Sequence, residues 1–283
     1  MPDDPSHALN GRQREMLDLV RQQGFVAIEA LAEHFGVTSQ TIRRDVNSLC
    51  RAGMLRRYHG GAGLPSSVEN EAYTARRVQR RAEKQRIARA LAHQIPNQAS
   101  LFMTLGTTTE EVARALMDHR GLRVITNNLN VATTLSGNPT FEVIIAGGVV
   151  RHRDRGVTGE ATIDFVNQFK VDFAVMGISG IDHDGTLLDF DYHEVRVLQA
   201  IMRSARTVFL AADHSKFGRS AMVRLGHLRE IDGLFTDAAP PPAIRDVLAE
   251  AGVALFVARP EGAEAGAATR PAAGGADVRT KTM

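Results

Sequence analysis

The stretch that decides the fold of the N-terminal part of the chain is VTSQTIRRDVNSLCR, which covers residues 37–51. Thr38 is a favoured N-cap residue, and Val37 and Ile42 occupy the two positions of a hydrophobic staple around it. The apolar residues recur at helical spacing and predict a side that faces a core; they are Ile42, Val46 and Leu49. The stretch therefore predicts a helix that begins after Thr38 and runs to about residue 51.

The opposite side of this predicted helix is polar and basic, and its side chains recur at the spacing of one helix face. Glutamine can pair with adenine and arginine with guanine in the major groove of DNA, while hydroxyl groups can reach phosphates. We therefore predict a DNA-contacting surface made of Thr38, Ser39, Gln40, Thr41, Arg43, Arg44 and Asn47.

Two shorter apolar patterns precede this helix. Met16, Leu17 and Val20 predict a first helix, and residues 31–35 predict a second helix that Gly36 ends. Two helices joined by a short turn, the second one polar and basic at its front, are typical of a helix-turn-helix. The pattern alone is also compatible with a helical interaction module that has a basic surface.

The stretch RRYHGG at residues 56–61 joins basic side chains to a pair of glycines. This composition predicts a hairpin with a glycine tip, a wing that would lie against the DNA backbone or in the minor groove. Arg57, His59 and Gly60 are therefore added to the predicted DNA contacts. Together with the helices, the hairpin predicts a winged helix-turn-helix domain at residues 1–62.

The bulk composition fits a protein of one large or two ordinary domains. The chain has 283 residues, of which 43% are hydrophobic and 23% charged, so a sizeable core can be buried without a disulfide or metal. The single cysteine, Cys50, excludes an intramolecular disulfide and fits a reducing compartment. The sequence contains no apolar stretch of membrane-helix length and no secretion signal. We therefore expect a cytoplasmic protein without membrane contact.

Residues 63–92 are polar, basic and helix-prone, and we expect them to form a basic helical linker. Local basic density attracts a phosphate backbone, although a solvated helix face is the commoner reason for a run of charge. The basic side chains of this segment are Arg76, Arg77, Arg80, Arg81, Lys84, Arg86 and Arg89.

From about residue 93 to residue 258, short apolar runs alternate with amphipathic segments, which predicts a mostly parallel sheet flanked by helices. Ligands bind at the carboxyl ends of parallel strands, and small polar residues follow the predicted strands, so we expect one shared polar cleft. The tail at residues 259–283 is rich in alanine and glycine, and we expect it to be disordered. The predicted strands lie at 100–104, 122–126, 141–146, 171–177 and 207–211.

Gly106, Thr107 and Thr108 follow the first predicted strand of this region and open a helix. Main-chain N–H groups, the helix dipole and hydroxyls favour an anion at such a place. The loop has no lysine, which excludes a nucleotide-binding P-loop. A plain threonine cap is an equally good interpretation.

Two charged clusters farther along could join this cleft. Asp189, Asp191 and Glu194 open a predicted helix, where the dipole alone favours carboxylates. Lys216 follows a predicted strand and fits either a phosphate partner or solvent exposure. A carboxylate base near a lysine would also suit sugar-phosphate isomerase chemistry. No histidine or cysteine spacing supports a metal site, and we expect neither a metal nor a cofactor.

The segments VTSQTIRRD (37–45) and RRYHGGA (56–62) resemble the N-terminal signature of the DeoR family of bacterial regulators. The resemblance extends from about residue 13 to about residue 255. The position two before Gly106 is often aspartate in this family and is Thr104 here, which favours sensing over turnover. Other segments that carry the resemblance are residues 24–35, 83–96, 124–132, 159–169, 177–195, 213–223 and 236–242.

The resemblance implies an α/β sensor domain of the isomerase/coenzyme A-transferase type at residues 93–258, related to ribose-5-phosphate isomerase. It implies a DNA-binding repressor of glycerol and glycerol 3-phosphate catabolism genes, relieved by a phosphorylated effector, glycerol 3-phosphate, rather than an enzyme. The residues that it places at the effector are Gly106, Thr107 and Thr108 at the phosphate, with Asn127, Gly147, Gly148 and Lys216 nearby.

Helix-turn-helix proteins read inverted repeats as symmetric pairs, so we expect a homo-oligomer on an inverted-repeat operator. Two alternatives stay open at this point. One is a sugar-phosphate isomerase-type enzyme that carries a DNA-binding appendage, and the other is a repressor of the same class with a different sugar-phosphate effector.

Overall fold

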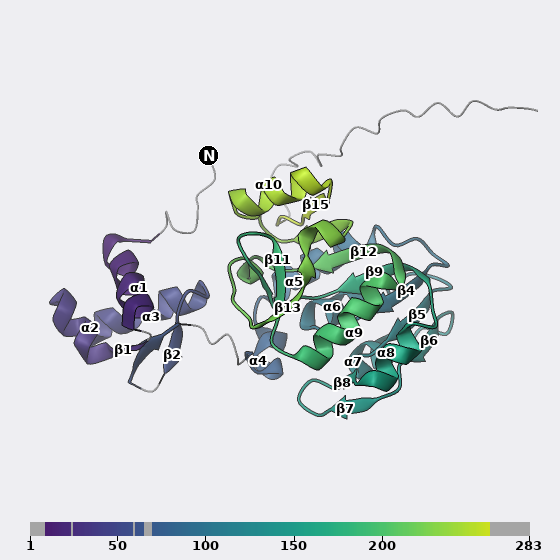
Figure 1. The fold of residues 1–283 in the computed structure, drawn as a ribbon, viewed down its shortest axis with the longest axis horizontal. Helices are drawn as coiled ribbons and strands as arrows, with labels where there is room; N and C mark the ends of the chain where they lie inside the picture. Colours follow the sequence, from purple (N-terminus) through teal and green to yellow (C-terminus); the bar gives the residue numbers. More distant parts are fainter. Residues whose placement is uncertain (1–8, 24, 59, 65–69, 261–283) are drawn as a thin grey trace, which may run out of the picture.

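The computed structural model describes residues 9–23, 25–58, 60–64 and 70–260. A small N-terminal domain lies on the left of Figure 1 and a larger α/β domain on the right, and the chain passes between them through the short helix α4 (Tyr73–Val78). The disorder expected for the tail falls on residues that are, from 261 onward, outside the described part of the chain. None of the described helices has the length and apolar composition that a membrane crossing requires.

The small domain joins three helices to an antiparallel sheet. The helices are α1 (Gly11–Gln23), α2 (Ile28–Phe35) and α3 (Ser39–Arg51). The strands are β1 (Phe25–Ala27), β2 (Arg56–Tyr58) and β3 (Gly61–Gly63), in the order β1-β3-β2. This arrangement confirms the predicted winged helix-turn-helix, with α2 and α3 as the two helices and β2–β3 as the hairpin.

Local chemistry explains where α2 and α3 meet. Gly36 ends α2 in a left-handed conformation with φ of 62°, which glycine adopts without strain. Thr38 is the N-cap of α3, and its hydroxyl accepts a hydrogen bond from the Thr41 N–H at 3.3 Å. Val37 packs on the core of the small domain, which contains the fully buried Ile42, and the direct contact of the predicted staple stays a prediction.

The large domain is built on a sheet of seven described strands in the order β15-β14-β12-β9-β4-β5-β6, and every pair of neighbours is parallel. The mostly parallel α/β domain predicted from the sequence is therefore confirmed. The strands are β4 (Ser100–Met103), β5 (Arg123–Thr126), β6 (Glu142–Ile145), β9 (Val171–Met176), β12 (Ala205–Ala211), β14 (Gly233–Thr236) and β15 (Ala254–Val257).

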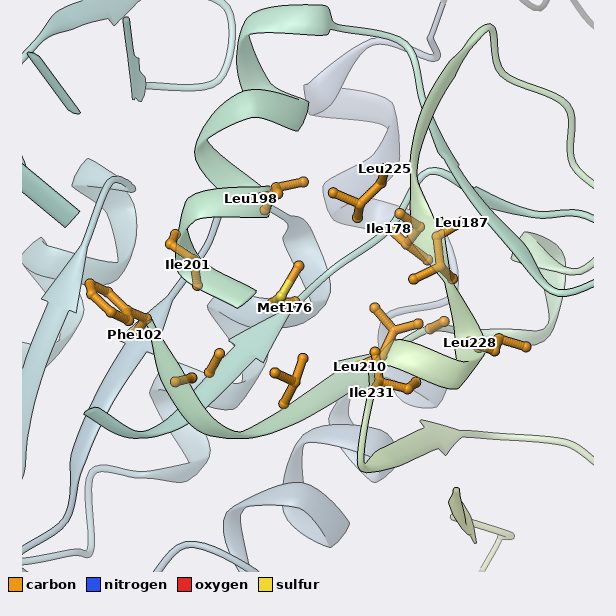
Figure 2. Close-up of a cluster of buried hydrophobic side chains, with 14 of the residues drawn as sticks. Phe102, Met176, Ile178, Leu187, Leu198, Ile201, Leu210, Leu225, Leu228 and Ile231 are labelled. Carbon is orange, nitrogen blue, oxygen red and sulfur yellow. The ribbon is translucent and has the colours of Figure 1, made fainter. Parts of the chain in front are cut away.

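Alternate residues of each strand feed a hydrophobic cluster on each face of this sheet. Phe102 and Met176 face the cluster under α8 (Glu160–Val166), α9 (Tyr192–Arg203) and α10 (Pro242–Ala251). Figure 2 shows these two side chains near Leu198 and Ile201 of α9. On the other face, residues such as Leu101 pack against α5 (Arg81–Ala92), α6 (Thr107–Ala115) and α7 (Leu129–Leu135).

The segment expected as a basic linker contains two helices with different surroundings. In α4, no residue is buried. In α5, by contrast, Ile87 and Leu91 are fully buried in the cluster shared with α6. The basic residues of α5 are therefore part of a helix whose apolar side packs in the core of the large domain.

Smaller elements complete the large domain. One is the hairpin of β7 (Val149–Arg151) and β8 (Gly156–Thr158). Another is an antiparallel sheet of β10 (Gly180–Ile181), β11 (Thr186–Asp189) and β13 (Val223–His227). The single-turn helices η1 (His214–Lys216) and η2 (Leu228–Glu230) follow β12 and β13.

Because Ile42 is fully buried in the core of the small domain, we predict that Ile42→Ala lowers its free energy of unfolding by about 2–5 kcal/mol. Native-state hydrogen exchange of the α1 and α3 amides would measure this loss within the full chain. The matched control on the same helix is Gln40→Ala. Because the Gln40 side chain is exposed, this change should alter the free energy of unfolding by less than about 0.5 kcal/mol. Equal protection in Ile42→Ala and wild type would contradict the packing described here.

Candidate functional site

The outer face of α3 presents a row of polar side chains to solvent. Gln40, Arg43, Arg44 and Asn47 are exposed, while Ile42 on the opposite face is fully buried. The structure therefore brings these four predicted DNA contacts together on one surface, which we name the reading face. Amide and guanidinium groups held on an exposed helix suit the edges of bases in the major groove.

The first turn of α3 holds the predicted hydroxyl contacts. Thr38 and Ser39 lie at its amino end with Thr41 one turn in. The Thr38 and Thr41 hydroxyl oxygens are 3.0 Å apart, and Thr38 is already engaged as the cap. Thr38 therefore caps α3, and its contact with DNA stays a prediction.

Asp45 fixes the orientation of the reading face, and sequence reasoning did not assign it a role. Its carboxylate accepts from Arg12 Nε at 2.6 Å and from Gln13 Nε2 at 3.2 Å, both on α1. Only 10% of the Asp45 side chain is exposed. A charged residue inside an otherwise apolar helix face was the signal that could have indicated this buried pair.

The hairpin that follows α3 carries the remaining predicted DNA contacts. Arg57 on β2 is exposed, and Gly60 turns the chain with φ of 82°, a conformation that favours glycine. His59 lies outside the described residues. The basic hairpin of β2 and β3 therefore follows α3 in the chain and belongs to the small sheet of the same domain, as expected of a wing.

A polar cavity of about 560 Å³ opens at the carboxyl ends of β4 and β9 in the large domain. Gly106 after β4 and Gly177 after β9 form its floor. Its walls come from the hairpin residues 151–154, from residues 189–191 with Glu194, and from residues 70–74 with Arg76. The shared cleft expected at the strand ends is thus present, although not every strand end contributes to it.

The loop after β4 brings Leu105 and Gly106 to this cavity. Gly106 is the N-cap of α6, and no described side chain caps this helix end. Thr107 and Thr108 form its first turn and are largely buried. Thr109, which sequence reasoning did not single out, donates its hydroxyl to the Thr104 carbonyl at 2.9 Å and to the Gly106 carbonyl at 2.7 Å. An uncapped helix start of this kind is favourable for an anion.

Of the predicted effector residues, only Gly106 is among those that line the cavity; Thr107, Thr108, Asn127, Gly147, Gly148 and Lys216 do not line it. Asn127 is buried and donates Nδ2 to the Val157 carbonyl at 3.0 Å. The Gly147 carbonyl accepts from the Thr162 hydroxyl at 2.8 Å, and Gly148 follows with φ of 150°. Their contact with an effector therefore stays a prediction.

The acidic end of the cavity is organised by Arg151. Its guanidinium donates to both oxygens of Asp154 at 2.8 and 2.7 Å, to Asp191 at 2.6 Å and to Glu194 at 2.6 Å. Arg153 adds a second bond to Asp191 at 2.9 Å. The sequence indicated the carboxylates of residues 189–194, but not the arginine that neutralises them from a distant hairpin.

Arg151 does not fully offset the burial of the carboxyl groups in this cluster, and the pKa values of two of them show this. Burial and the neighbouring charge of Asp189 raise the pKa of Glu194 to about 7. Burial also raises the pKa of Asp189, whose exposed fraction is 4%. Glu194 can therefore accept or donate a hydrogen bond near neutral pH.

Basic side chains also border the cavity, close to Asp189. Arg76 lines it, and Arg219 lies against its wall, donating to the Ser179 carbonyl at 3.1 Å and stacking 5.0 Å from the centre of the Phe190 ring. Burial lowers the pKa of Lys216 to about 8, with Asp213 opposing this shift and Arg219 adding to it. The predicted Lys216 thus belongs to the cationic group beside the cavity, although it does not line it.

This arrangement offers partners for a small molecule that carries both an anionic group and hydroxyl groups. The anion would meet the start of α6 and the arginines, and the hydroxyls would meet the carboxylates. Within the part of the chain that the structure describes, no group of histidine, cysteine and carboxylate residues could hold a metal ion. A DNA-reading helix joined to such a cavity defines a ligand-responsive DNA-binding regulator.

Comparison with known families agrees with this class. The model for the DeoR-like helix-turn-helix domain matches residues 12–68, and the model for the DeoR C terminal sensor domain matches residues 79–238. The chain belongs to the DeoR family.

Several curated proteins are similar over most of the chain. The glycerol-3-phosphate regulon repressor of Escherichia coli (strain K12) is 52% identical over 86% of this chain and 97% of that protein. The protein of the same name from Haemophilus influenzae is 49% identical over 81% and 89%. The HTH-type transcriptional repressor CsqR of Escherichia coli is 41% identical over 88% and 95%. These relatives are named as regulators, which supports the expectation of a regulator rather than an enzyme.

Solved structures give only distant likenesses. Ribose 5 phosphate isomerase A from Neisseria gonorrhoeae has a TM-score of 0.34 at 13% identity and aligns with 48% of this chain and 53% of that chain. For eIF2B delta from Chaetomium thermophilum the TM-score is 0.44 at 15% identity, over 57% and 58%. We draw no conclusion about this chain from likenesses this distant.

Removing Arg151 should leave Glu194 without its ion-pair partner and should leave Asp154 and Asp191 with Arg153 as their remaining one. We predict that Arg151→Met lowers the free energy of unfolding by roughly 3–5 kcal/mol at about pH 8. The loss should shrink toward about pH 5, because carboxyl groups whose pKa is raised in the folded state are then protonated and no longer repel one another. Chemical denaturation at both pH values would measure it.

The matched control is Arg153→Met, because 58% of the Arg153 side chain is exposed and such pairs contribute about 1 kcal/mol or less. A loss in Arg151→Met that is the same at both pH values would contradict the electrostatic account of this cluster.

Proposed function

We propose that the chain is a transcriptional repressor of glycerol and glycerol 3-phosphate catabolism genes, and that glycerol 3-phosphate releases it from its operator. The names and high identity of the relatives support the regulon. The observation that carries the proposal is the cavity itself, because guanidinium groups, carboxylates and an uncapped helix start line it together and suit a short polyol phosphate.

The phosphate would lie at the amino end of α6, where Gly106, Thr107 and Thr108 offer main-chain N–H groups, with Lys216 as a nearby cation. The hydroxyl groups would donate to the carboxylates that Arg151 holds in place. A molecule with a phosphate and no hydroxyls would satisfy only half of this site. The effector contacts of Asn127, Gly147 and Gly148 remain part of the proposal.

On the DNA side, the reading face and the wing are proposed to contact an inverted-repeat operator. A symmetric site needs symmetric protein copies, so the proposal includes a homo-oligomer. The proposed division of labour assigns DNA reading to residues 1–62, connection to residues 63–92 and sensing to residues 93–258.

The alternative of a sugar-phosphate isomerase-type enzyme rests on Glu194 and Lys216, whose pKa values of about 7 and about 8 suit proton transfer. Against it, Arg151 holds Glu194 in an ion pair at 2.6 Å, and Thr104 offers no carboxylate. The Thr104 hydroxyl accepts from the Gly177 N–H at 3.3 Å and so joins the ends of β4 and β9. We therefore assign the cavity to sensing.

Operator binding titrated with phosphate compounds tests the effector. Glycerol 3-phosphate should weaken binding to an operator fragment at concentrations where inorganic phosphate and glycerol do not, because only the ester carries both the anionic group and the hydroxyl groups. Fluorescence anisotropy of a labelled operator would measure this. Release by a pentose phosphate instead would replace the effector and keep the repressor, whereas turnover of that compound would favour the enzyme.

Substitution on the reading face tests the DNA contacts. We predict that Arg43→Ala weakens binding to the specific operator by about 5-fold to 150-fold, the effect of losing one good base contact. The control is Arg123→Ala on the large domain, whose side chain is 74% exposed and far along the chain from α3. The same small change in both variants would remove Arg43 from the reading face.

A further inference from the structure

The short segment that joins the two family domains forms one wall of the cavity. We infer that this connector, residues 70–80, transmits the state of the cavity to α3, and that Tyr73 is the positioning residue that holds it in the ligand-free arrangement. The inference rests on the proposed function and adds to it the element that moves. Residues 70–78 lie outside both family models.

The connector adheres to the large domain through polar contacts rather than through a core. No residue of α4 is buried, so little apolar surface holds this helix in place. Yet six connector residues line the cavity, namely Asn70, Glu71, Ala72, Tyr73, Thr74 and Arg76. A molecule that fills the cavity must therefore touch the connector directly.

Tyr73 makes the strongest of these polar contacts. Its hydroxyl donates to the two carboxylate oxygens of Glu110 at 2.8 and 2.9 Å, and it accepts from Asn130 Nδ2 at 2.9 Å. Asn130 also donates to Glu110 at 3.1 Å, which closes a small network between α4, α6 and α7. Burial and the bond to Glu110 raise the pKa of Tyr73 to about 12, so the phenol keeps its proton at neutral pH.

Further contacts hold the connector on either side of Tyr73. Asn70, which lines the cavity, accepts from Arg219 Nη2 at 2.9 Å. Lys84 donates its ammonium group to the Gln79 carbonyl at 2.8 Å and to the Arg76 carbonyl, at the carboxyl end of α4. An anion that binds Arg76 or Arg219 would compete with this arrangement.

The far end of the connector reaches the DNA-binding domain. Arg80 donates Nη2 at 2.9 Å to the carbonyl of Arg51, the last residue of α3, and its Nε lies 3.9 Å from the buried carboxylate of Asp213. Arg80 has φ of 50°, a left-handed conformation that is strained for a residue with a side chain. One residue thus connects the reading helix, the turn between α4 and α5, and the charged group beside the cavity.

These contacts define two arrangements of the connector. In the held arrangement the connector lies on the cavity and α3 is fixed. In the released arrangement these contacts are broken. An effector can shift the balance between them only through unequal affinity. If the effector prefers the released arrangement, a change that weakens only the held one must tighten effector binding and loosen operator binding. Damage to the cavity or to the fold would instead weaken effector binding.

Tyr73→Phe makes this change, because it removes the hydroxyl and keeps the ring. We expect the apparent Kd for glycerol 3-phosphate, measured by calorimetry on the full chain, to fall by about 3-fold to 10-fold. The operator Kd without effector should rise by about twofold or more. The matched control is Tyr192→Phe, which makes the same change on a tyrosine that is 57% exposed and does not line the cavity.

An effector Kd that rises would show that Tyr73 only contacts the ligand and would overturn the inference. Unchanged affinities for both effector and operator would overturn it as well. If wild-type operator binding ignores glycerol 3-phosphate and other sugar phosphates, the proposed function fails instead. In that case the operator Kd of Tyr73→Phe still decides whether the connector positions α3.

Discussion

The parallel direction of the large sheet is the constraint on which the rest of this structure depends. Because every neighbouring pair among its described strands runs the same way, the chain leaves β4, β9 and β12 at one edge. The glycines after β4 and β9 line the cavity at this edge. The polar segment that contains η1 follows β12 at the same edge of the sheet. The hydrophobic clusters on the two faces hold this geometry and leave the edge free for polar chemistry.

The charged side chains at that edge form ion pairs. A carboxylate moved out of water is tolerated where a guanidinium or several donors meet it, and Arg151 satisfies this need for three carboxylates at once. Arg219 and Lys216 lie near Asp213, and burial lowers the pKa of both cations. Charges of both signs are therefore held close together at the cavity, where they interact more strongly than they would in water.

Local patterns in the sequence predicted the helices and strands, but they did not predict which distant residues would pair. The cap at Thr38, the spacing from Ile42 to Leu49 and the apolar runs of the sheet depend on neighbours along the chain, so helices and strands could be predicted. Arg151 meets Glu194, and Tyr73 meets Glu110, across 43 and 37 residues. No periodicity indicates such partners, because the fold rather than the local sequence brings them together.

The contact between Arg80 and α3 is made with a main-chain carbonyl, a group that every residue type carries. Substitutions on the exposed side of α3 can change which bases are preferred without removing this acceptor. Recognition and release can therefore diverge independently in descendants of such a chain. A duplicated copy could acquire a new set of target promoters while it still answers to the same metabolite.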